Sequence, residues 1–171
     1  MTDELSEYDR NWILELLDSQ EALLVRYCFK LTGNLEQSKE IVQQTWLKLI
    51  KRDDLRMIKS YAVQWLYTVC RNSCMDHLRK VGNVDSLEDI QTPSALILDD
   101  KTTEINEIFR MIKSLPASQQ EVILLKFQEG FSYKEISKIT GHSISNVGFL
   151  IHRGISTLRG ALQGQNEEEN L

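Results

Sequence analysis

Residues 132–154 read SYKEISKITGHSISNVGFLIHRG, the pattern of two short helices joined by a tight turn. Ser132 followed by Glu135 is typical of a capping box, which opens the first helix. Gly141 stands where such a turn needs a positive φ angle, and Ser143 is the expected cap of the second helix. The stretch therefore predicts a helix-turn-helix, the motif whose second helix places its N-terminal half in the major groove of DNA.

The second helix of this hairpin is predicted to have a buried face and an outer face, because its apolar residues recur at three- and four-residue steps. The predicted buried stripe is Ile144, Val147, Ile151, Ile155, Leu158 and Leu162. The predicted outer face is Ser145, Phe149, His152 and Ser156, with Asn146 and Arg153 along one flank. Plain helical hairpins share the glycine turn, but a merely solvated face is richer in Glu and Lys, whereas Ser, Asn, His and Arg bond bases or phosphates. Phe149 either touches a thymine methyl group or packs on another helix.

The charge of the chain raises a question for a protein that would bind a polyanion. Its 171 residues include 20 Lys+Arg against 25 Asp+Glu, a formal net charge of -5. Residues 1–25 hold one Arg against seven acids, whereas residues 26–85 hold eleven Lys and Arg against six acids. Residues 121–160 carry a small excess of positive charge between acidic segments. Two basic segments therefore stand out, although a solvated charged surface is the alternative explanation for each of them.

The composition is that of a folded helical protein. Hydrophobic residues make up 42% and charged residues 26%, enough to build a core, and 2 prolines and 8 glycines favour helices. No run approaches the roughly 20 apolar residues that cross a bilayer. The start MTDELSEYDR is acidic, the reverse of a signal peptide, so we expect a cytoplasmic protein without a membrane span. The three cysteines Cys28, Cys70 and Cys74 are an odd number and fit a reducing compartment.

Helical periodicity also extends over the N-terminal half. Asp18-Ser19-Gln20-Glu21 predicts a capping box, and the helix that it opens should run to Thr32 before Gly33. Asn34 is the expected cap of the next helix, which should end near Lys51. Its predicted apolar stripe is Ile41, Val42, Thr45, Trp46, Leu49 and Ile50.

A further helix is predicted from about Ser60 to Lys80, and Gly82 marks its end. Regular winding would bury Ala62, Leu66, Val69, Cys70 and Ser73. The same winding would leave outside Gln64, Thr68, Arg71, Asn72, Met75 and Arg79. Cys70, Cys74 and His77 share a helical face, which could be most of a zinc site. Because that face is the apolar one and a fourth ligand is missing, free core cysteines are the favoured interpretation and no metal is expected.

Residues 83–101 mix Asp, Ser and proline with scattered aliphatic residues, the pattern of a linker, although Leu96-Ile97-Leu98 indicates that part of it packs on a domain. Helices resume over residues 105–112. Pro116 suits the first turn of the next helix. That helix should reach Gly130 and carry Val122, Leu124, Leu125 and Phe127. The fold class that we predict is all-α, with two small helical domains joined by a flexible linker.

In this order the segments resemble the extracytoplasmic-function sigma factors of bacterial RNA polymerase, group IV of the sigma-70 superfamily. LPASQQEVILLKFQEGFSYKEISKITGHSISNVGFLIHRGISTLR, residues 115–159, is similar to region four, which reads the minus-thirty-five promoter element. LTGNLEQSKEIVQQTWLKLIK, residues 31–51, resembles the polymerase-binding part of region two. YAVQWLYTVCRNSCMDHLRK, residues 61–80, resembles the segment that opens and reads the minus-ten element. The resemblance covers roughly residues 15–162.

The resemblance implies a division of the chain and a set of site residues. Region two would be residues 1–82, the linker 83–101, region four 102–163 and an acidic tail 164–171. The residues implied to bind core polymerase are Glu40, Gln43, Gln44, Trp46 and Leu47. Those implied at the minus-ten element are Arg71, Asn72, Ser73, Asp76, Arg79 and Lys80. Those predicted at the minus-thirty-five element are Ser143, Ser145, Asn146, Phe149, His152 and Arg153.

Two details of the resemblance affect these roles. In the family a loop that captures a flipped base falls at residues 71–74, which implies a break in the helix predicted there, with Trp65 and Tyr67 as aromatic neighbours of the base. Departures occur at Lys39-Glu40 and Gln44, and at Gly148-Phe149-Leu150, where the family frequently has Lys-Ser-Arg. Individual base contacts therefore do not transfer directly from the family.

The sequence favours a sigma factor without catalytic residues or cofactors, because it has no Gly-rich phosphate loop and no Ser or Cys arranged with His and Asp. Expected partners are promoter DNA, the beta-prime coiled coil and beta subunit of core RNA polymerase, and an anti-sigma factor as a further candidate. The free protein is expected to be a monomer. A dimeric helix-turn-helix regulator of the response-regulator type and a helical adaptor that binds no nucleic acid are the alternatives.

Overall fold

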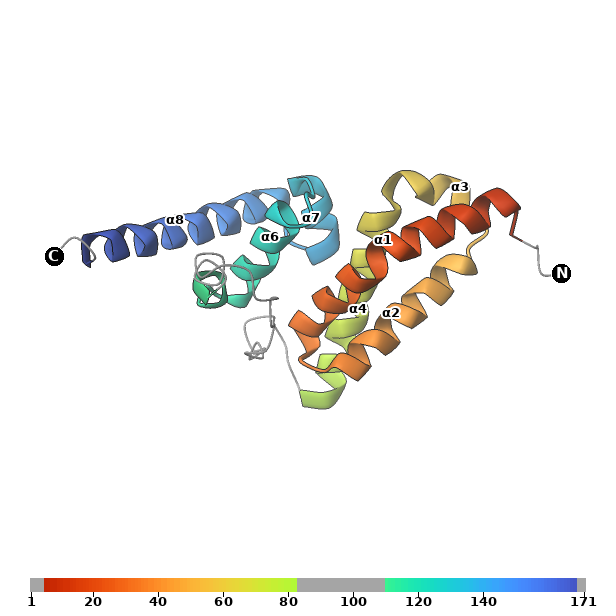
Figure 1. The fold of residues 1–171 in the computed structure, drawn as a ribbon, viewed down its shortest axis with the longest axis horizontal. Coiled ribbons are helices and arrows are strands. Elements are labelled where there is room, and N and C mark those ends of the chain that lie inside the picture. The colour runs from red at the N-terminus through yellow and green to blue at the C-terminus, as the bar shows by residue number, and fades with distance from the viewer. Residues whose placement is uncertain (1–4, 83–109, 169–171) are drawn as a thin grey trace. The chain divides into compact units, whose positions relative to one another are not determined.

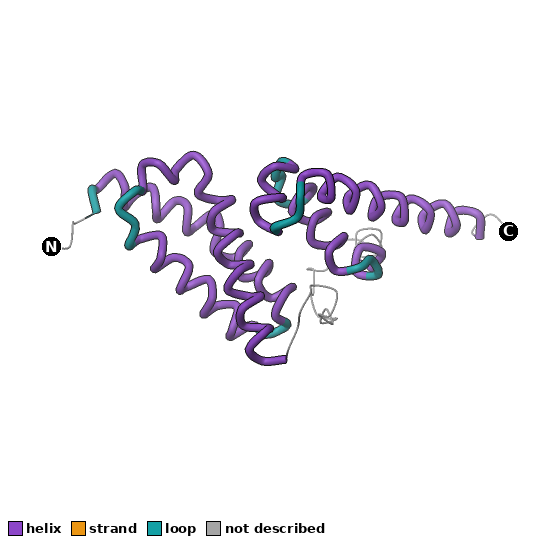
Figure 2. The backbone as a smooth tube through the Cα atoms, turned by 180° about the vertical axis from the view of Figure 1, so that it is seen from behind, coloured by secondary structure: helices purple, strands orange, loops and turns teal. Residues whose placement is uncertain are grey.

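The computed structural model describes residues 5–82 and 110–168, and every regular element in these two ranges is a helix (Figures 1 and 2). The chain divides into two compact units, Met1–Val84 and Asp85–Leu171. The predicted all-α fold with two helical domains is confirmed. The predicted linker and most of the helix predicted over 105–112 lie outside the described residues. No helix in the described ranges is both long and apolar enough to cross a bilayer.

The first unit is a bundle of three long helices with a short helical connection. Helix α1 spans Glu7–Thr32, α2 spans Leu35–Ile50 and α4 spans Ala62–Gly82. Between α2 and α4 lie α3, Leu55–Ile58, and a 3-10 turn, Lys59–Tyr61. Each long helix packs against the other two, and Figure 1 shows them side by side.

The start of α1 differs from the prediction, which placed a capping box at 18–21. The helix begins after Ser6, whose Oγ accepts a 3.1 Å hydrogen bond from the amide of Asp9 and donates to Asp9 Oδ2 at 2.6 Å. Residues 18–21 lie within the helix, where Ser19 Oγ donates to the carbonyl of Leu16 at 3.0 Å. The capping pattern was wrong because tertiary contacts extend the helix toward the N-terminus.

Those contacts converge on one lysine of the connection between α2 and α4. Lys59 Nζ lies 2.8 Å from Asp9 Oδ1, 4.1 Å from the ring centroid of Tyr8 and 4.9 Å from that of Trp12. Ile13 is buried one turn further along α1. The first two turns of α1 are therefore fastened to the bundle by an ion pair, two aromatic rings and an apolar anchor.

The turn between α1 and α2 follows the prediction. Gly33 has φ 67° and its amide donates to the carbonyl of Phe29 at 2.9 Å, so α1 ends at Thr32 as expected. Asn34 Oδ1 accepts from the amide of Gln37 at 3.0 Å and caps α2. Helix α2 ends at Ile50 with Lys51 as its C-cap, which agrees with the end predicted near Lys51.

The buried face of α4 is wider than one stripe. Ala62, Leu66 and Cys70 are buried as predicted, but Gln64 and Met75, predicted to lie outside, are buried as well. Val69 and Ser73, predicted to be buried, are only half-buried. The physical reason is that α1 and α2 both pack on α4, so the covered arc is broader than a single neighbour would require. Ile50 of α2 is 38% exposed, which also corrects its placement in the apolar stripe.

The three cysteines lie in this core as free thiols. Cys70 Sγ donates to Thr45 Oγ1 at 3.4 Å. Hydrogen bonding to Cys70 and Cys74, with burial, raises the pKa of the Cys28 thiol, which keeps it neutral. His77 is half-buried, and across residues 5–82 and 110–168 no group of three His, Cys, Asp or Glu side chains lies close enough to hold a metal ion.

The second unit contains the predicted helix-turn-helix. Helix α6 spans Ala117–Phe127, α7 spans Tyr133–Thr140 and α8 spans Ile144–Glu168, so α8 continues past residue 163 into the segment expected to be a tail. The capping box is formed: Ser132 Oγ accepts from the amide of Glu135 at 3.2 Å, and Glu135 Oε2 accepts from the amide of Ser132 at 2.8 Å. Gly141 has φ 79°. Ser143 Oγ accepts from the amide of Asn146 at 3.1 Å.

The bounds of α6 and the burial of several apolar residues in this unit differ from the prediction. Helix α6 ends at Phe127 rather than Gly130, and Phe127 is 64% exposed because the chain turns and buries Phe131 instead. Pro116 precedes the first residue of α6 with ψ 144°. Ile144 and Leu162 are 52% and 43% exposed. The C-terminal part of α8 extends beyond α6 and α7 (Figure 1).

Candidate nucleic-acid interface

The outward side of α8 carries the polar residues predicted to contact DNA. The exposed members are Ser143, Ser145, Asn146, Phe149, His152 and Arg153, so all six predicted residues are accessible. On the opposite side of the helix, Val147, Ile151 and Gly154 are buried against the unit. Ser143 caps the start of α8, and the other five side chains are exposed along its N-terminal half, where a groove-binding helix would present them.

A close helix crossing fixes the position of this surface. Gly154 of α8 faces Ile123 of α6, and a Cβ atom added at Gly154 would lie 2.4 Å from Ile123 Cδ1 and 3.5 Å from Leu115 Cδ1. A side chain at Gly154 would force the buried Ile123 side chain to move, so glycine allows α8 to pack closely on α6. This packing lies on the side of α8 opposite the exposed residues.

The turn before α8 is held by its own hydrogen bonds. Ser137 Oγ donates to the carbonyl of His142 at 2.6 Å, and the amide of His142 donates to Thr140 Oγ1 at 3.3 Å. Asn146 Nδ2 lies 3.3 Å from His142 Nδ1. These bonds fix the angle at which α8 leaves the turn, and they engage one predicted contact residue, Asn146, before any DNA binds.

Gly148 lies on the flank of α8 that faces the start of α7. A Cβ atom at this position would lie 3.5 Å from Tyr133 Cε2, an ordinary contact distance, so a side chain could be accommodated. Lys126 Nζ lies 5.4 Å from the centroid of the Tyr133 ring. Lys126 of α6 and Gly148 of α8 therefore both lie close to the Tyr133 ring.

The second unit exposes more positive charge than the whole chain implies. Residues 110–164 include seven Lys and Arg against three Glu. Among the acids, Glu121 is buried. Glu135 keeps its negative charge, because hydrogen bonds from the side chain and amide of Ser132 lower its pKa. Lys134, Lys138 and Arg153 are exposed. The surface around α7 and α8 is thus modestly cationic, as phosphate contacts require.

A second polar surface lies on α4, near its C-terminal end. Its exposed members recur at three- and four-residue steps and share one helix face: Asn72, Asp76, Arg79 and Lys80. Arg71 and Ser73, beside this face, are half-buried. Arg79 Nη1 lies 3.1 Å from Asp76 Oδ1, and both side chains are more than half exposed. Helix α4 runs without interruption from Ala62 to Gly82, so the break expected at residues 71–74 was wrong.

The two aromatic residues expected near a captured base have different environments. Tyr67 is fully buried, and its ring centroid lies 5.0 Å from that of Tyr27, so it belongs to the core. Trp65 is half-buried, and the guanidinium of Arg52 lies 5.2 Å from its ring centroid. Of the two rings, only that of Trp65 reaches the surface.

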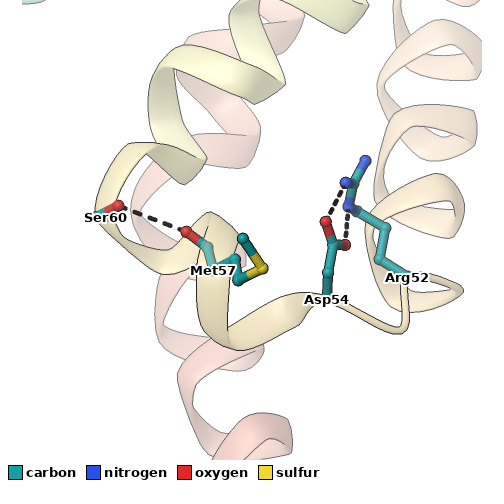
Figure 3. A network of polar contacts seen from close by, with 4 residues as sticks. All are labelled: Arg52, Asp54, Met57 and Ser60. Carbon is teal, nitrogen blue, oxygen red and sulfur yellow. Dashed lines mark hydrogen bonds and ion pairs between the residues drawn. The ribbon is translucent and has the colours of Figure 1, made fainter.

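Arg52 lies beside the Trp65 ring and was not identified as a candidate residue from the sequence. Its Nε and Nη2 donate to Asp54 Oδ1 and Oδ2 at 2.6 Å each, a bidentate pairing (Figure 3). The same guanidinium is the one that lies 5.2 Å from the Trp65 ring centroid. The hydrogen bonds from Arg52 lower the pKa of Asp54. The following turn is closed by Ser60 Oγ and the carbonyl of Met57 at 3.5 Å. An Arg-x-Asp pattern just after a helix was the signal available in the sequence.

The residues predicted to bind polymerase lie on α2 but not on one surface. Glu40, Gln43, Gln44 and Leu47 are exposed, and Leu47 is 41% exposed. Trp46 is 4% exposed, so it packs in the core on the buried side of α2. Of the five predicted residues, only the four exposed side chains are accessible to a partner.

Comparisons with known proteins match both units. The family model of Sigma-70 region 2 matches residues 16–84, and that of Sigma-70, region 4 matches residues 105–158. The chain is 25% identical over 170 residues to the ECF RNA polymerase sigma factor SigW of Bacillus subtilis, with 91% of each chain covered. It is 28% identical over 163 residues to the RNA polymerase sigma factor CarQ of Myxococcus xanthus, with 89% of this chain and 93% of CarQ covered.

A solved structure is also similar over most of the chain. It is the sigma factor RpoE in complex with the anti-sigma factor NepR from Bartonella quintana. The sequence identity is 25%, the TM-score is 0.68, and the match covers 90% of this chain and 98% of the other. The likeness therefore includes both helical units and their order along the chain.

Proposed function

The chain belongs to the sigma-70 family, in its extracytoplasmic-function group, and we propose that it presents two separate helix faces, on α4 and α8, to promoter DNA. As a sigma factor it directs promoter recognition and transcription initiation. In this proposal the exposed side of α2 binds core RNA polymerase in the cytoplasm. The polymerase supplies all catalysis, and this chain supplies recognition.

The observation that carries the proposal is the surface of α8. The six side chains predicted to contact the DNA groove are exposed, and the helix that carries them is capped at its start. On its opposite side, α8 packs closely on α6 at Gly154. This supports reading of the upstream element by α8 through direct base and phosphate contacts. The polar face of α4, with Arg79 and Lys80, supports contact with the downstream element in the same complex.

The modest charge of these surfaces supports a dependence on polymerase. Each phosphate contact adds to affinity and to salt dependence, and seven cations against three acids in residues 110–164 allow few such contacts. When both units are carried by polymerase, the second contact with DNA becomes intramolecular and gains a high effective concentration. Two DNA-binding surfaces of low individual affinity can then bind one promoter stably.

An anti-sigma factor is part of the proposal as well. The similar structure is a sigma factor bound to such a protein, and the similarity extends over 90% of this chain. A binding protein of this kind would cover part of the exposed helix faces and keep the chain from polymerase. Co-purification from the source cells, followed by identification of a stoichiometric partner, tests this part separately.

Run-off transcription with purified core polymerase tests the main proposal. On a library of promoter fragments, the chain should create new start sites that core polymerase alone does not use. Those sites should share two dissimilar sequence elements at a constant spacing. If core polymerase neither binds the chain nor starts RNA at new sites in its presence, the proposal is wrong.

A further inference from the structure

Phe149 is the one large apolar side chain among the predicted contact residues of α8. It is 59% exposed, and it points away from the side where Val147 and Ile151 are buried. The alternative that it packs on another helix therefore finds no support among the described residues. Its neighbours one turn away on the same face are the exposed Ser145 and Arg153.

We propose that Phe149 recognises the 5-methyl group of a thymine in the promoter element bound by α8. The inference rests on the proposed function, because it requires α8 to lie in the major groove. A phenyl ring has no hydrogen-bond donor or acceptor, so it cannot read the polar edge of a base. The thymine methyl is the apolar feature that the major groove offers.

The surroundings of the ring favour DNA over a protein as the occupant. Phe149 is flanked by a hydroxyl, an imidazole and a guanidinium, from Ser145, His152 and Arg153. These groups pair with phosphates and base edges, whereas the centre of a protein-binding patch is depleted in charged side chains. Lys134 and Lys138 on α7 are also exposed and add positive charge to the same unit.

Gly148 lies next to Phe149 in the sequence but faces another part of the unit. A Cβ atom added at Gly148 would lie 3.5 Å from Tyr133 Cε2 of α7. A side chain at Gly148 would therefore start beside α7, whereas Phe149 is 59% exposed. Of these two neighbouring positions, Phe149 is the one that extends away from the unit.

Removal of single methyl groups from the DNA tests the proposal. Each thymine of the upstream element is replaced in turn by deoxyuridine, and competition binding is measured with the complete holoenzyme. With the native chain, one replacement should weaken binding about three- to fivefold, the effect of one buried methyl group. With Phe149→Ala the same replacement should have no effect, and with Phe149→Leu an intermediate one. Gln163→Ala, an exposed change far along α8, should retain the full effect.

The outcomes separate this inference from the proposed function. If the holoenzyme requires the upstream element but no deoxyuridine replacement weakens it, the role of Phe149 is wrong and the proposed function stands. If Phe149→Ala instead weakens assembly with core polymerase, the ring contacts protein and the inference is also wrong. If the holoenzyme starts no RNA at all, the proposed function itself fails.

Discussion

The polar faces of α4 and α8 differ in how their charges are held. On α4, Arg79 is paired with Asp76 at 3.1 Å, so a carboxylate stands beside the cation that would bind a phosphate. On α8, the six contact residues include no acid, and Arg153 is exposed. The comparison indicates that the α4 surface is partly neutralised by its own carboxylate, whereas no acid lies among the contact residues of α8. Predictions that test this difference follow from the largest expected effect to the smallest.

Gly154→Val should produce the largest effect. The added side chain would overlap Ile123 of α6, because even a Cβ atom would come within 2.4 Å of its Cδ1. We expect a loss of about 2–3 kcal/mol in the stability of the second unit, measured by hydrogen exchange of α6 and α8 amides. Gly160→Ala is the matched control: nothing lies within 4 Å of it, so it should stabilise the helix slightly. Unchanged exchange in Gly154→Val would contradict the close crossing.

Arg79→Ala should impair promoter opening by about 1–3 kcal/mol if the side chain makes one good polar contact with DNA. The effect is measured as the fraction of open complexes formed by the holoenzyme on duplex promoter. Arg10→Ala, an exposed arginine of α1, is the control and should open promoters normally. Normal opening by Arg79→Ala would remove this residue from the α4 site.

Gly148→Lys should strengthen the binding of α8 to DNA. The position has room for a side chain beside Tyr133, and lysine is a better helix former than glycine by roughly 1 kcal/mol. A new phosphate contact should steepen the salt dependence of holoenzyme binding by about 0.9 in the log–log slope. Gly164→Lys, where nothing lies within 4 Å, should give the helix gain without the change in slope. An equal slope for both variants would argue against a phosphate near residue 148.

Asp76→Asn should change promoter opening the least of these variants. It should increase the fraction of open complexes, whereas Arg79→Ala should decrease it. Asp76→Asn releases an exposed ion pair worth about 0.2–1 kcal/mol, so open complexes should form a few-fold more readily. Asp18→Asn on α1 removes an equal charge from an exposed position and serves as the control. Weaker opening in Asp76→Asn would mean that the carboxylate itself accepts a hydrogen bond from DNA.

The sequence was sufficient where local geometry decides the structure. The capping box at Ser132, the positive φ at Gly141 and the cap at Asn34 each depend on a few adjacent residues, and all three are formed. The exposure of the α8 contact residues also followed from periodicity alone. These features need no knowledge of what packs on the helix from elsewhere.

Features that depend on distant partners were missed. The start of α1 is set by Lys59, about fifty positions later in the chain, and the broad buried arc of α4 is set by two neighbouring helices. The placement of Arg52 beside Trp65 depends on a turn between α2 and α3. Periodicity also overstated the burial of Leu162, because it does not indicate where α8 leaves its neighbours.

Binding of the free chain to a promoter tests the central claim most directly. Fluorescence anisotropy of a labelled promoter fragment is measured with the full-length chain alone and with the chain bound to core polymerase, at one salt concentration. The account predicts that the free chain does not distinguish the promoter from a scrambled fragment, and that the complex binds the promoter stably. Tight, sequence-specific binding by the free chain would contradict it.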